Sequence, residues 1–487
     1  MIYIHWLLLL VYTLTIAIAM LKVLMDNRQP AKTLAWLMVL SFLPMAGIVL
    51  YFFFGQNTRK EKLISRHSID QLTKRSMLEF VEQKDLEYPK ECQQMISLFY
   101  NQSMALPFKD NDVEILTSGY TFFATFLAEL GKAESHIHLE SYIFEDDPLG
   151  NLVADVLIDK ARQGVEVRVI YDDVGNWNVR NAFYERMRSE GIDVHAFMPV
   201  KFPAFTSKVN YRNHRKLCII DGRTGFIGGM NIAIRYIKGK GDTPWRDTHL
   251  KIKGGGIYAI QRAFLVDWYF VDRTLITDRK YYPTPTGNIS NDCLAQVVTS
   301  SPIAQWPEIM QGYVMVLLKA TKYVYLESPY FLPTEPVLFA MRTASQTGVD
   351  VRLMIPMRSD SKIVDWASRS YLAEAMESGV KVYLYKAGFN HTKMMVSDDI
   401  VSTCGSTNID FRSFENNFES NIFFYQRNMA LRMKELFLAD LKECVELTDA
   451  NSRRAATCSG RDRKLQAAKK FLTRLWVSLL RLLSPLL

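Results

Sequence analysis

The stretch "NHRKLCIIDGRTGFIGGMNI", residues 213–232, decides the fold, because "HTKMMVSDDIVSTCGSTNI" at residues 391–409 repeats its pattern. Both contain His-x-Lys-x4-Asp, followed at equal distances by a glycine and an asparagine, and every matched position recurs 177 residues later. A pattern of this length that occurs twice predicts a duplicated domain. The matched residues are His214, Lys216, Asp221, Gly228 and Asn231 in the first copy, and His391, Lys393, Asp398, Gly405 and Asn408 in the second.

The sequence around the two stretches repeats as well. "IHLES" at residues 137–141 is echoed by "VYLES" at 324–328, and "GVEVR" at 164–168 by "GVDVR" at 348–352. In the first copy a helical run at 149–164 lies between the segments "IHLES" and "GVEVR". Such strand–helix–strand alternation predicts an α/β fold. We therefore expect two α/β lobes, residues 112–272 and 292–448, joined by a linker at 273–291 that is rich in turn-forming residues.

The N-terminus is strongly apolar. Residues 4–21 contain no Lys, Arg, Asp or Glu, and residues 33–54 form a second uncharged stretch with Trp36 near one end and Tyr51 near the other. Each approaches the roughly 20 residues that span a bilayer as a helix. Residues 1–57 are therefore expected to form two transmembrane helices. A cleaved signal peptide is the alternative for the first stretch, but no basic region precedes it.

Basic residues beside this expected hairpin predict its orientation. Residues 22–32 contain three Lys or Arg, whereas residues 58–75 contain six. The more basic side usually faces the cytoplasm, so we expect a multi-pass protein of the cell (inner) membrane with a cytoplasmic catalytic domain. Residues 58–111 are expected to be a helical connector. Residues 449–487 predict a basic amphipathic helix on the membrane surface, with a core helix as the alternative.

Bulk composition excludes little by itself. The net charge of +8 over 487 residues suits nucleic acid and an anionic membrane surface equally. The six cysteines lack C-x-x-C spacing, which argues against a zinc site or a disulfide framework. Cys218 and Cys404 lie in apolar runs and are expected to be small core residues.

The spacing within each stretch has a chemical meaning. Residues two apart in a strand point to the same face, so each His projects beside its Lys. Asp221 and Asp398 are seven residues from their histidines and lie in turns, so a scaffold role is expected for them. Asn231 and Asn408 offer amide donors to a phosphate oxygen.

Two copies of this set that face one cleft suit in-line attack on a phosphodiester. One His would attack phosphorus and the other would protonate the leaving alkoxide, while lysines and asparagines balance charge. No metal or other cofactor is expected, because the lysines supply positive charge. Asp247 and Glu419, further along each copy, are candidates to orient the histidines, with ordinary surface acids as the equal alternative.

These motifs resemble those of the phospholipase D superfamily, and "GSTNIDFRSFENNFESN" and the apolar N-terminus are similar to cardiolipin synthases. The resemblance implies a two-lobed phospholipase D fold, with mixed sheets flanked by helices. It also implies that two phosphatidylglycerol molecules give cardiolipin and glycerol through a phosphatidyl-histidine, with His214 as nucleophile and His391 as acid–base partner. The implied catalytic residues are His214, Lys216, Asp221, His391, Lys393 and Asp398.

Three other readings compete with this one. A phospholipase D, or another head-group exchanger, would pass the phosphatidyl group to water or a different alcohol. A nuclease would use the same phosphodiester chemistry, but nucleic acid as a partner does not explain the apolar N-terminus. A non-catalytic membrane scaffold would not need two intact His–Lys motifs. We therefore expect phosphatidylglycerol and anionic membrane lipids as partners, and no nucleic acid.

Overall fold

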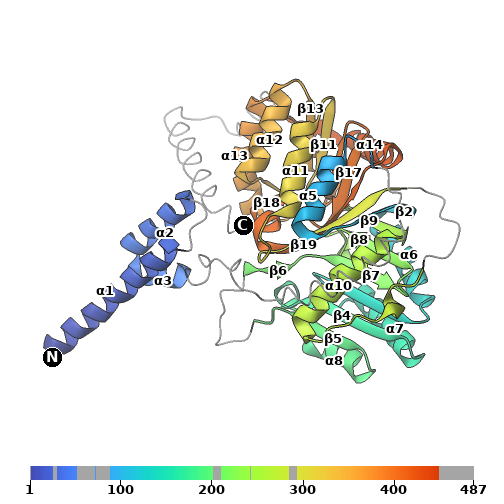
Figure 1. The fold of residues 1–487 in the computed structure, drawn as a ribbon, viewed down its shortest axis with the longest axis horizontal. Coiled ribbons are helices and arrows are strands. Elements are labelled where there is room, and N and C mark those ends of the chain that lie inside the picture. The colour runs from blue at the N-terminus through green and yellow to red at the C-terminus, as the bar shows by residue number, and fades with distance from the viewer. Residues whose placement is uncertain are drawn as a thin grey trace.

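The computed structural model describes residues 2–25, 30–51, 72, 88–200, 210–241, 243–284 and 293–448. Figure 1 shows a large two-lobed body and, projecting from it, a group of N-terminal helices. The amphipathic helix expected at 449–487 lies outside the described residues, as does most of the expected connector. The described end of that connector forms α5 (Gln93–Ser103) and β1 (Pro107–Phe108).

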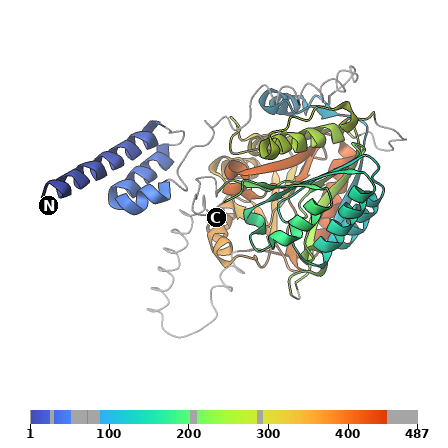
Figure 2. The ribbon, with the colours of Figure 1, turned by 90° about the horizontal axis from the view of Figure 1, so that it is seen from below.

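The first N-terminal helix, α1 (Ile2–Met25), matches the first expected span. Its segment Tyr3–Met25 has a mean hydropathy of 2.4, and it is the one helix among the described residues that is long and apolar enough to cross a membrane. Figure 2 shows α1 extending away from the body. The structure therefore provides a single candidate span where the sequence predicted two.

The second expected span is wrong as a continuous helix. It is divided into α2 (Pro30–Phe42) and α3 (Pro44–Leu50), because Pro44 has no N–H to donate and disfavours helical geometry at Leu43, whose φ and ψ are −130° and 59°. The α3 helix folds back on α2: a Cβ on Gly47 would lie 2.9 Å from the Val39 oxygen. Two short helices side by side thus stand where one continuous helix was expected.

The first lobe is built around a mixed sheet with the order β15-β9-β8-β7-β3-β4-β5, in which β15 (Phe389–Asn390) comes from the second lobe, and β2 pairs with β9. The β3, β4 and β5 strands are parallel, whereas β7, β8 and β9 are antiparallel. The strands are β2 (Asn111–Ser118), β3 (His136–Ser141), β4 (Glu166–Asp172), β5 (Asp193–Phe197), β7 (Lys216–Ile220), β8 (Thr224–Gly228) and β9 (Trp245–Gly254). The helices are α6 (Gly119–Gly131), α7 (Pro148–Arg162), α8 (Asn181–Ser189), α9 (Arg235–Lys238) and α10 (Gly256–Asp272).

The second lobe repeats this arrangement in the sheet order β1-β10-β19-β17-β16-β11-β13-β14-β20. The expected duplicated α/β fold is confirmed. Its strands are β10 (Ala295–Ser300), β11 (Tyr323–Glu327), β13 (Asp350–Pro356), β14 (Lys381–Tyr385), β16 (Met394–Ser397), β17 (Val401–Gly405), β19 (Asn417–Phe424) and β20 (Cys444–Glu446). Its helices are α11 (Glu308–Lys319), α12 (Glu335–Gln346), α13 (Lys362–Glu377) and α14 (Arg427–Leu441).

The lobes exchange short strands. The two-residue strand β6 (Arg212–Asn213) comes from the first lobe and pairs with β19 of the second. The matching strand β15 (Phe389–Asn390) comes from the second lobe and pairs with β9 of the first. Each exchanged strand ends directly before a motif histidine. Backbone pairing with the other lobe therefore fixes the position of that histidine's backbone.

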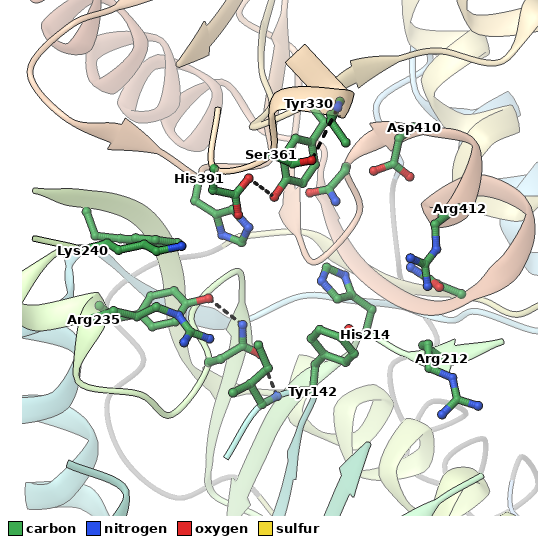
Figure 3. A pocket seen from close by; sticks show the side chains of 18 of the residues that line it. Tyr142, Arg212, His214, Arg235, Lys240, Tyr330, Ser361, His391, Asp410 and Arg412 are labelled. Atoms are coloured by element: carbon green, nitrogen blue, oxygen red, sulfur yellow. Dashed lines mark hydrogen bonds between the residues drawn. The ribbon is translucent and has the colours of Figure 1, made fainter. Parts of the chain in front are cut away.

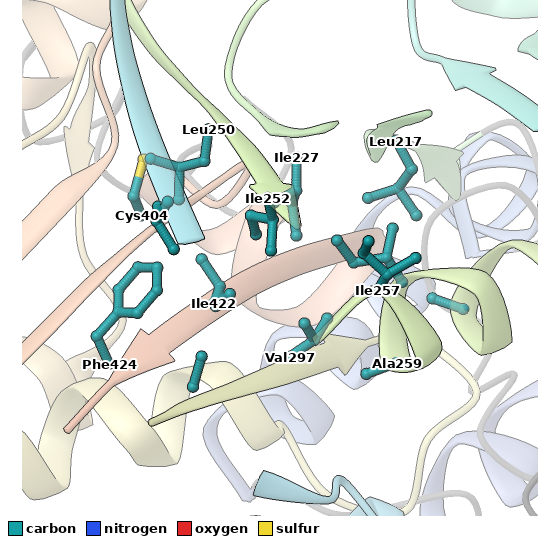
Figure 4. Close-up of a cluster of buried hydrophobic side chains, with 14 of the residues drawn as sticks. Leu217, Ile227, Leu250, Ile252, Ile257, Ala259, Val297, Cys404, Ile422 and Phe424 are labelled. Atoms are coloured by element: carbon teal, nitrogen blue, oxygen red, sulfur yellow. The ribbon is translucent and has the colours of Figure 1, made fainter. Parts of the chain in front are cut away.

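One apolar core joins the lobes. Figure 4 shows side chains of the first lobe packed against side chains of the second, and all of them are buried. Burial of a Leu or Ile side chain is worth about 1.5–3 kcal/mol, so an interface of several such residues holds the two sheets in a fixed relation. Cys218 and Cys404 are buried too, as expected. The core residues in Figure 4 include Leu217, Ile227, Leu250, Ile252, Val297, Ile422 and Phe424.

Candidate active site

A cavity of about 620 Å³ lies between the lobes, and both motif histidines line it. Figure 3 shows the imidazole rings of His214 and His391 on opposite sides of this cavity. The strand exchange explains the placement, because each histidine follows the residue pair that its own lobe lends to the other sheet. The two motifs therefore form one site, as the duplicated pattern predicted.

His214 is held by the second lobe. Its backbone N–H donates to the Phe418 oxygen at 2.9 Å, and its Nδ1 lies 3.0 and 3.1 Å from the carboxylate oxygens of Glu419 on β19. A carboxylate only accepts hydrogen bonds, so Nδ1 carries the proton in the neutral ring. The lone pair is then on Nε2, the nitrogen a nucleophile or base would use.

His391 is held in the same way by the first lobe. Its N–H donates to the Arg246 oxygen at 2.7 Å, and its Nδ1 lies 2.7 Å from Oδ2 of Asp247 on β9. Asp247 and Glu419 are thus in contact with the histidines, but the pairing crosses between lobes. The sequence did not indicate which carboxylate meets which histidine. The pairing is crosswise because β9 and β19 each run beside the strand lent by the other lobe.

Burial and the carboxylates set the charge of the site. Burial lowers the pKa of His391 to about 3 and also brings the pKa of His214 below its ordinary value. Burial alone would raise the pKa of Glu419, but His214 and Lys216 outweigh it and lower that pKa. Lys393 and His391 have the same net effect on the pKa of Asp247. Before substrate binds, the histidines are therefore neutral at neutral pH and the carboxylates are ionised.

The motif lysines lie beside their histidines, as the strand spacing predicted. Lys216 Nζ donates to the His214 carbonyl at 2.6 Å, and Lys393 Nζ donates to the His391 carbonyl while lying 2.7 Å from its Nδ1. Burial lowers the pKa of Lys216 to about 7 and that of Lys393 to about 8. Asp247 and Glu419 offset only part of the cost of burying these ammonium groups, so a phosphate anion beside the lysines would favour their charged form.

The motif aspartates stand apart from the cavity. Asp221 has φ 55° and accepts hydrogen bonds from the backbone N–H groups of residues 134–136, at the start of β3. Asp398 has φ 54° and accepts from residues 321–323, at the start of β11. Each ties the turn after its motif strand to the neighbouring strand. This agrees with the expected scaffold role and not with direct participation in chemistry.

Asn231 and Asn408 both line the cavity. The Asn231 amide is already engaged, because Nδ2 donates to the Tyr236 hydroxyl at 2.5 Å and Oδ1 accepts from the Ile143 N–H at 3.1 Å. Oδ1 of Asn408 is buried with no hydrogen-bond partner among the described residues. Their role as phosphate ligands stays a prediction.

Several residues that line the cavity or lie beside its lining were not singled out from the sequence. Asn390, next to His391, donates to Glu327 at 2.8 Å, and Asn213 donates to Glu140 in the same way. The repeated "LES" of 139–141 and 326–328 was the available signal, since both glutamates lie in it. The residues of the cavity lining itself that were not singled out include Tyr142, Arg212, Arg235, Lys240, Tyr330, Asp360, Asp410 and Arg412.

A family model described as "Cardiolipin synthase, PLD-like domain" matches residues 126–252 and 313–441, the two lobes of the body. The chain belongs to the cardiolipin synthase family. Membership makes it a phosphatidyltransferase of the phospholipase D type that acts on phospholipids. A second model, "Phospholipase_D-nuclease N-terminal", matches residues 13–56 and, with α1, fits the membrane association of the family.

Relatives extend this result along the chain. It is 36% identical over 482 residues to a cardiolipin synthase of Alkalihalophilus pseudofirmus, covering 98% of this chain and 93% of that protein. It is also 36% identical over 449 residues to the major cardiolipin synthase ClsA of Bacillus subtilis, covering 89% and 92%. The crystal structure of phosphatidylserine synthase from Haemophilus influenzae has a TM-score of 0.59 at 15% identity, covering 82% of this chain and all of that one, which shows a shared fold.

Proposed function

We propose that this cardiolipin synthase family member transfers a phosphatidyl group from one phosphatidylglycerol to another, giving cardiolipin and glycerol. One observation carries the proposal. Two histidines on opposite sides of a single cavity have Nδ1 held by a buried carboxylate, which frees both Nε2 atoms for chemistry. In-line displacement at phosphorus needs such an arrangement, with a nucleophile on one side and an acid on the other.

In the first half-reaction, His214 Nε2 attacks the phosphorus of the donor lipid. The N–P bond forms, the P–O bond to glycerol breaks, and His391 gives its proton to the departing alkoxide. His391 binds that proton when the anionic phosphodiesters enter, since their charge opposes the effect of burial, and Asp247 stabilises the resulting imidazolium. Glycerol leaves and a phosphatidyl-histidine remains on His214.

In the second half-reaction, His391 acts as a base. It takes the proton from the terminal hydroxyl of a second phosphatidylglycerol, whose oxygen attacks the phosphatidyl-histidine. The new P–O bond forms as the N–P bond to His214 breaks, so cardiolipin is released and His391 is protonated again. The same pair of histidines thus serves both steps, and His391 changes from acid in the first step to base in the second.

Cationic groups around the cavity balance the phosphate charge. Lys216 and Lys393 each donate to the carbonyl of their motif histidine, and Arg212 and Arg412 line the cavity. An anion drawn into this site favours the charged form of both lysines, which then stabilise the charge that builds on the equatorial oxygens. This scheme assigns the positive charge to side chains and requires no metal ion.

We further propose that the body lies at the cytoplasmic face of the inner membrane. If α1 spans the bilayer and α2 and α3 fold back at its inner end, then residues 22–32 and 58–75, with nine Lys or Arg between them, share the cytoplasmic side. This arrangement replaces the hairpin expected from the sequence and leaves the cytoplasmic location of the body unchanged. Both substrates are then held in one leaflet, and nucleic acid has no part in the proposal.

The decisive experiment uses the purified full chain in mixed micelles with labelled phosphatidylglycerol. Cardiolipin and free glycerol are expected in equal amounts. Phosphatidic acid with glycerol would mean that water is the acceptor and the protein a phospholipase. If neither cardiolipin nor phosphatidic acid forms, phosphatidylglycerol is excluded as the donor.

A further inference from the structure

Many of the side chains that line the cavity between the lobes are charged or polar, which suits lipid head groups. Its side chains include Arg212, Arg235, Asp410 and Arg412, together with the two histidines. If the substrates are the phospholipids of the proposed function, on which this inference rests, their acyl chains must stay outside the mouth. The surface around the mouth then decides whether a lipid can reach phosphorus without leaving the bilayer.

Large apolar side chains are exposed next to the cavity lining on the second lobe. At the start of α13, Ser361 and Val364 line the cavity, while Ile363 between them is 48% exposed and Trp366 is 42% exposed. On the N-terminal side of the same loop, Met357 is 42% exposed. These side chains cover no core, so burying them would be favourable.

The first lobe contributes to the same feature from other loops. Trp177 is 60% exposed and follows Asn176, whose Nδ2 donates to the oxygen of the lining residue Tyr142 at 2.9 Å. Ile237 is exposed between the lining residues Tyr236 and Gly239. We call these five residues the apolar rim: Trp177, Ile237, Met357, Ile363 and Trp366.

Basic side chains are interspersed with the rim. Lys238 and Lys240 are exposed beside Ile237, and Arg358 and Lys362 are exposed beside Met357 and Ile363. Two carboxylates lie in the same stretch: Asp360 lines the cavity and accepts a hydrogen bond from Tyr330 at 2.9 Å, and Asp365 pairs with Arg369. Tryptophan and aliphatic side chains mixed with Lys and Arg are typical of surfaces that rest in an anionic lipid interface.

We propose that the apolar rim seats the cavity mouth on the anionic bilayer, so that head groups enter the site while acyl chains remain in the leaflet. Two further observations favour lipid over a protein partner as the occupant. The rim residues adjoin residues that line the cavity, in a chain whose family acts on phospholipids, and α13 lies on the side of the body that faces α2 and α3 in both views (Figures 1 and 2). In this proposal the rim and α1 contact the same bilayer.

The test compares two forms of substrate with the full chain. Ile363→Ser, Trp366→Ser and the double variant are assayed on long-chain phosphatidylglycerol in proteoliposomes and on dihexanoyl phosphatidylglycerol dispersed in nonionic detergent. The double variant is expected to lose about tenfold or more of the bilayer rate, since two buried apolar side chains are removed from the interface. Its rate on the dispersed short-chain lipid is expected to stay within about twofold of wild type, because it touches no reacting group.

Leu318→Ser is the matched control, because Leu318 is 50% exposed near the end of α11 that leads into β11, whose opposite end leads to the cavity. It should change neither rate. Equal loss of rate on both substrates would mean that the rim residues act in catalysis or in folding, and it would overturn the proposal. An unchanged bilayer rate would also overturn it and leave the rim to a protein partner or a second copy. If wild type releases glycerol but forms no cardiolipin, the proposed function fails. The rate of glycerol release on each substrate then still shows whether the rim variants are impaired only on the bilayer.

Discussion

Asp247 of the first lobe lies 2.7 Å from Nδ1 of His391 in the second lobe. Glu419 of the second lobe contacts His214 of the first in the same crosswise manner. Neither lobe therefore contains an oriented histidine without the other, and the apolar core between the sheets sets the alignment of both rings. The chemistry depends on the packing of the lobes as much as on the motif residues.

Removing the charge of an orienting carboxylate should impair catalysis without unfolding the protein. Asp247→Asn and Glu419→Gln keep the shape but lose the fixed Nδ1–H tautomer, and each is expected to lower kcat by a factor on the order of 10³. A shifted pH profile should accompany the loss. Asp365→Asn, which removes an ion pair to Arg369 on α13, is the control. Full activity of either carboxylate variant would contradict the crosswise assignment.

The two histidine variants should differ in the intermediate they allow. His214→Ala and His391→Ala are both expected to abolish turnover while membrane insertion persists, because a complete catalytic cycle needs both rings. On rapid quench with labelled phosphatidylglycerol, His391→Ala should still accumulate a slow, acid-labile phosphatidyl adduct. His214→Ala should accumulate none. The reverse pattern would exchange the two roles, and substantial turnover by either variant would end the two-histidine mechanism.

Anion binding should weaken as the pH rises. Burial lowers the pKa of Lys216 to about 7 and that of Lys393 to about 8. Below these values the lysines are charged and ready for an anion, whereas above them each must first take up a proton. The inhibition constant of sulfate is therefore expected to be flat below pH 7 and to rise by up to about tenfold per pH unit for each lysine above its pKa. A constant value from pH 6 to 9 would show that the lysines do not meet the anion.

Asp221→Ala should destabilise the fold more than it harms the chemistry. The carboxylate accepts backbone hydrogen bonds from residues 134–136, and φ is 55° at this position. A loss of about 2 to 4 kcal/mol of stability is expected from these two effects. Asp221→Asn keeps an oxygen acceptor and tolerates positive φ, so its melting temperature should fall less. A large drop in kcat with an unchanged melting temperature would give Asp221 a direct role.

Chelating agents should leave activity unchanged. The proposed scheme places the positive charge on Lys216, Lys393 and the cavity arginines. Activity is measured with EDTA and then with added divalent ions, using a metal-dependent phosphodiesterase as the positive control. Loss on chelation that a divalent ion restores would require a different source of electrophilic assistance.

The sequence predicted the duplicated fold and both His–Lys pairs because a strand places residues two apart on one face. It did not predict which carboxylate meets which histidine, since spacing along a chain carries no information about strands exchanged between lobes. Arg212 and Arg412 have no repeat in the sequence to mark them as cavity residues. The break at Pro44, in contrast, had a signal in the sequence: a proline within an apolar run ends a helix.

The exchange of β6 and β15 has a consequence for how such a chain arose and how it works. A polypeptide with one lobe would find the carboxylate for its histidine only in a second molecule, so its activity would rise with the square of its concentration at low abundance. Joining two lobes in one chain turns that encounter into an intramolecular one, with an effective concentration on the order of millimolar that no dilution in the membrane can reduce. The halves are then free to diverge, one toward the donor lipid and the other toward the acceptor.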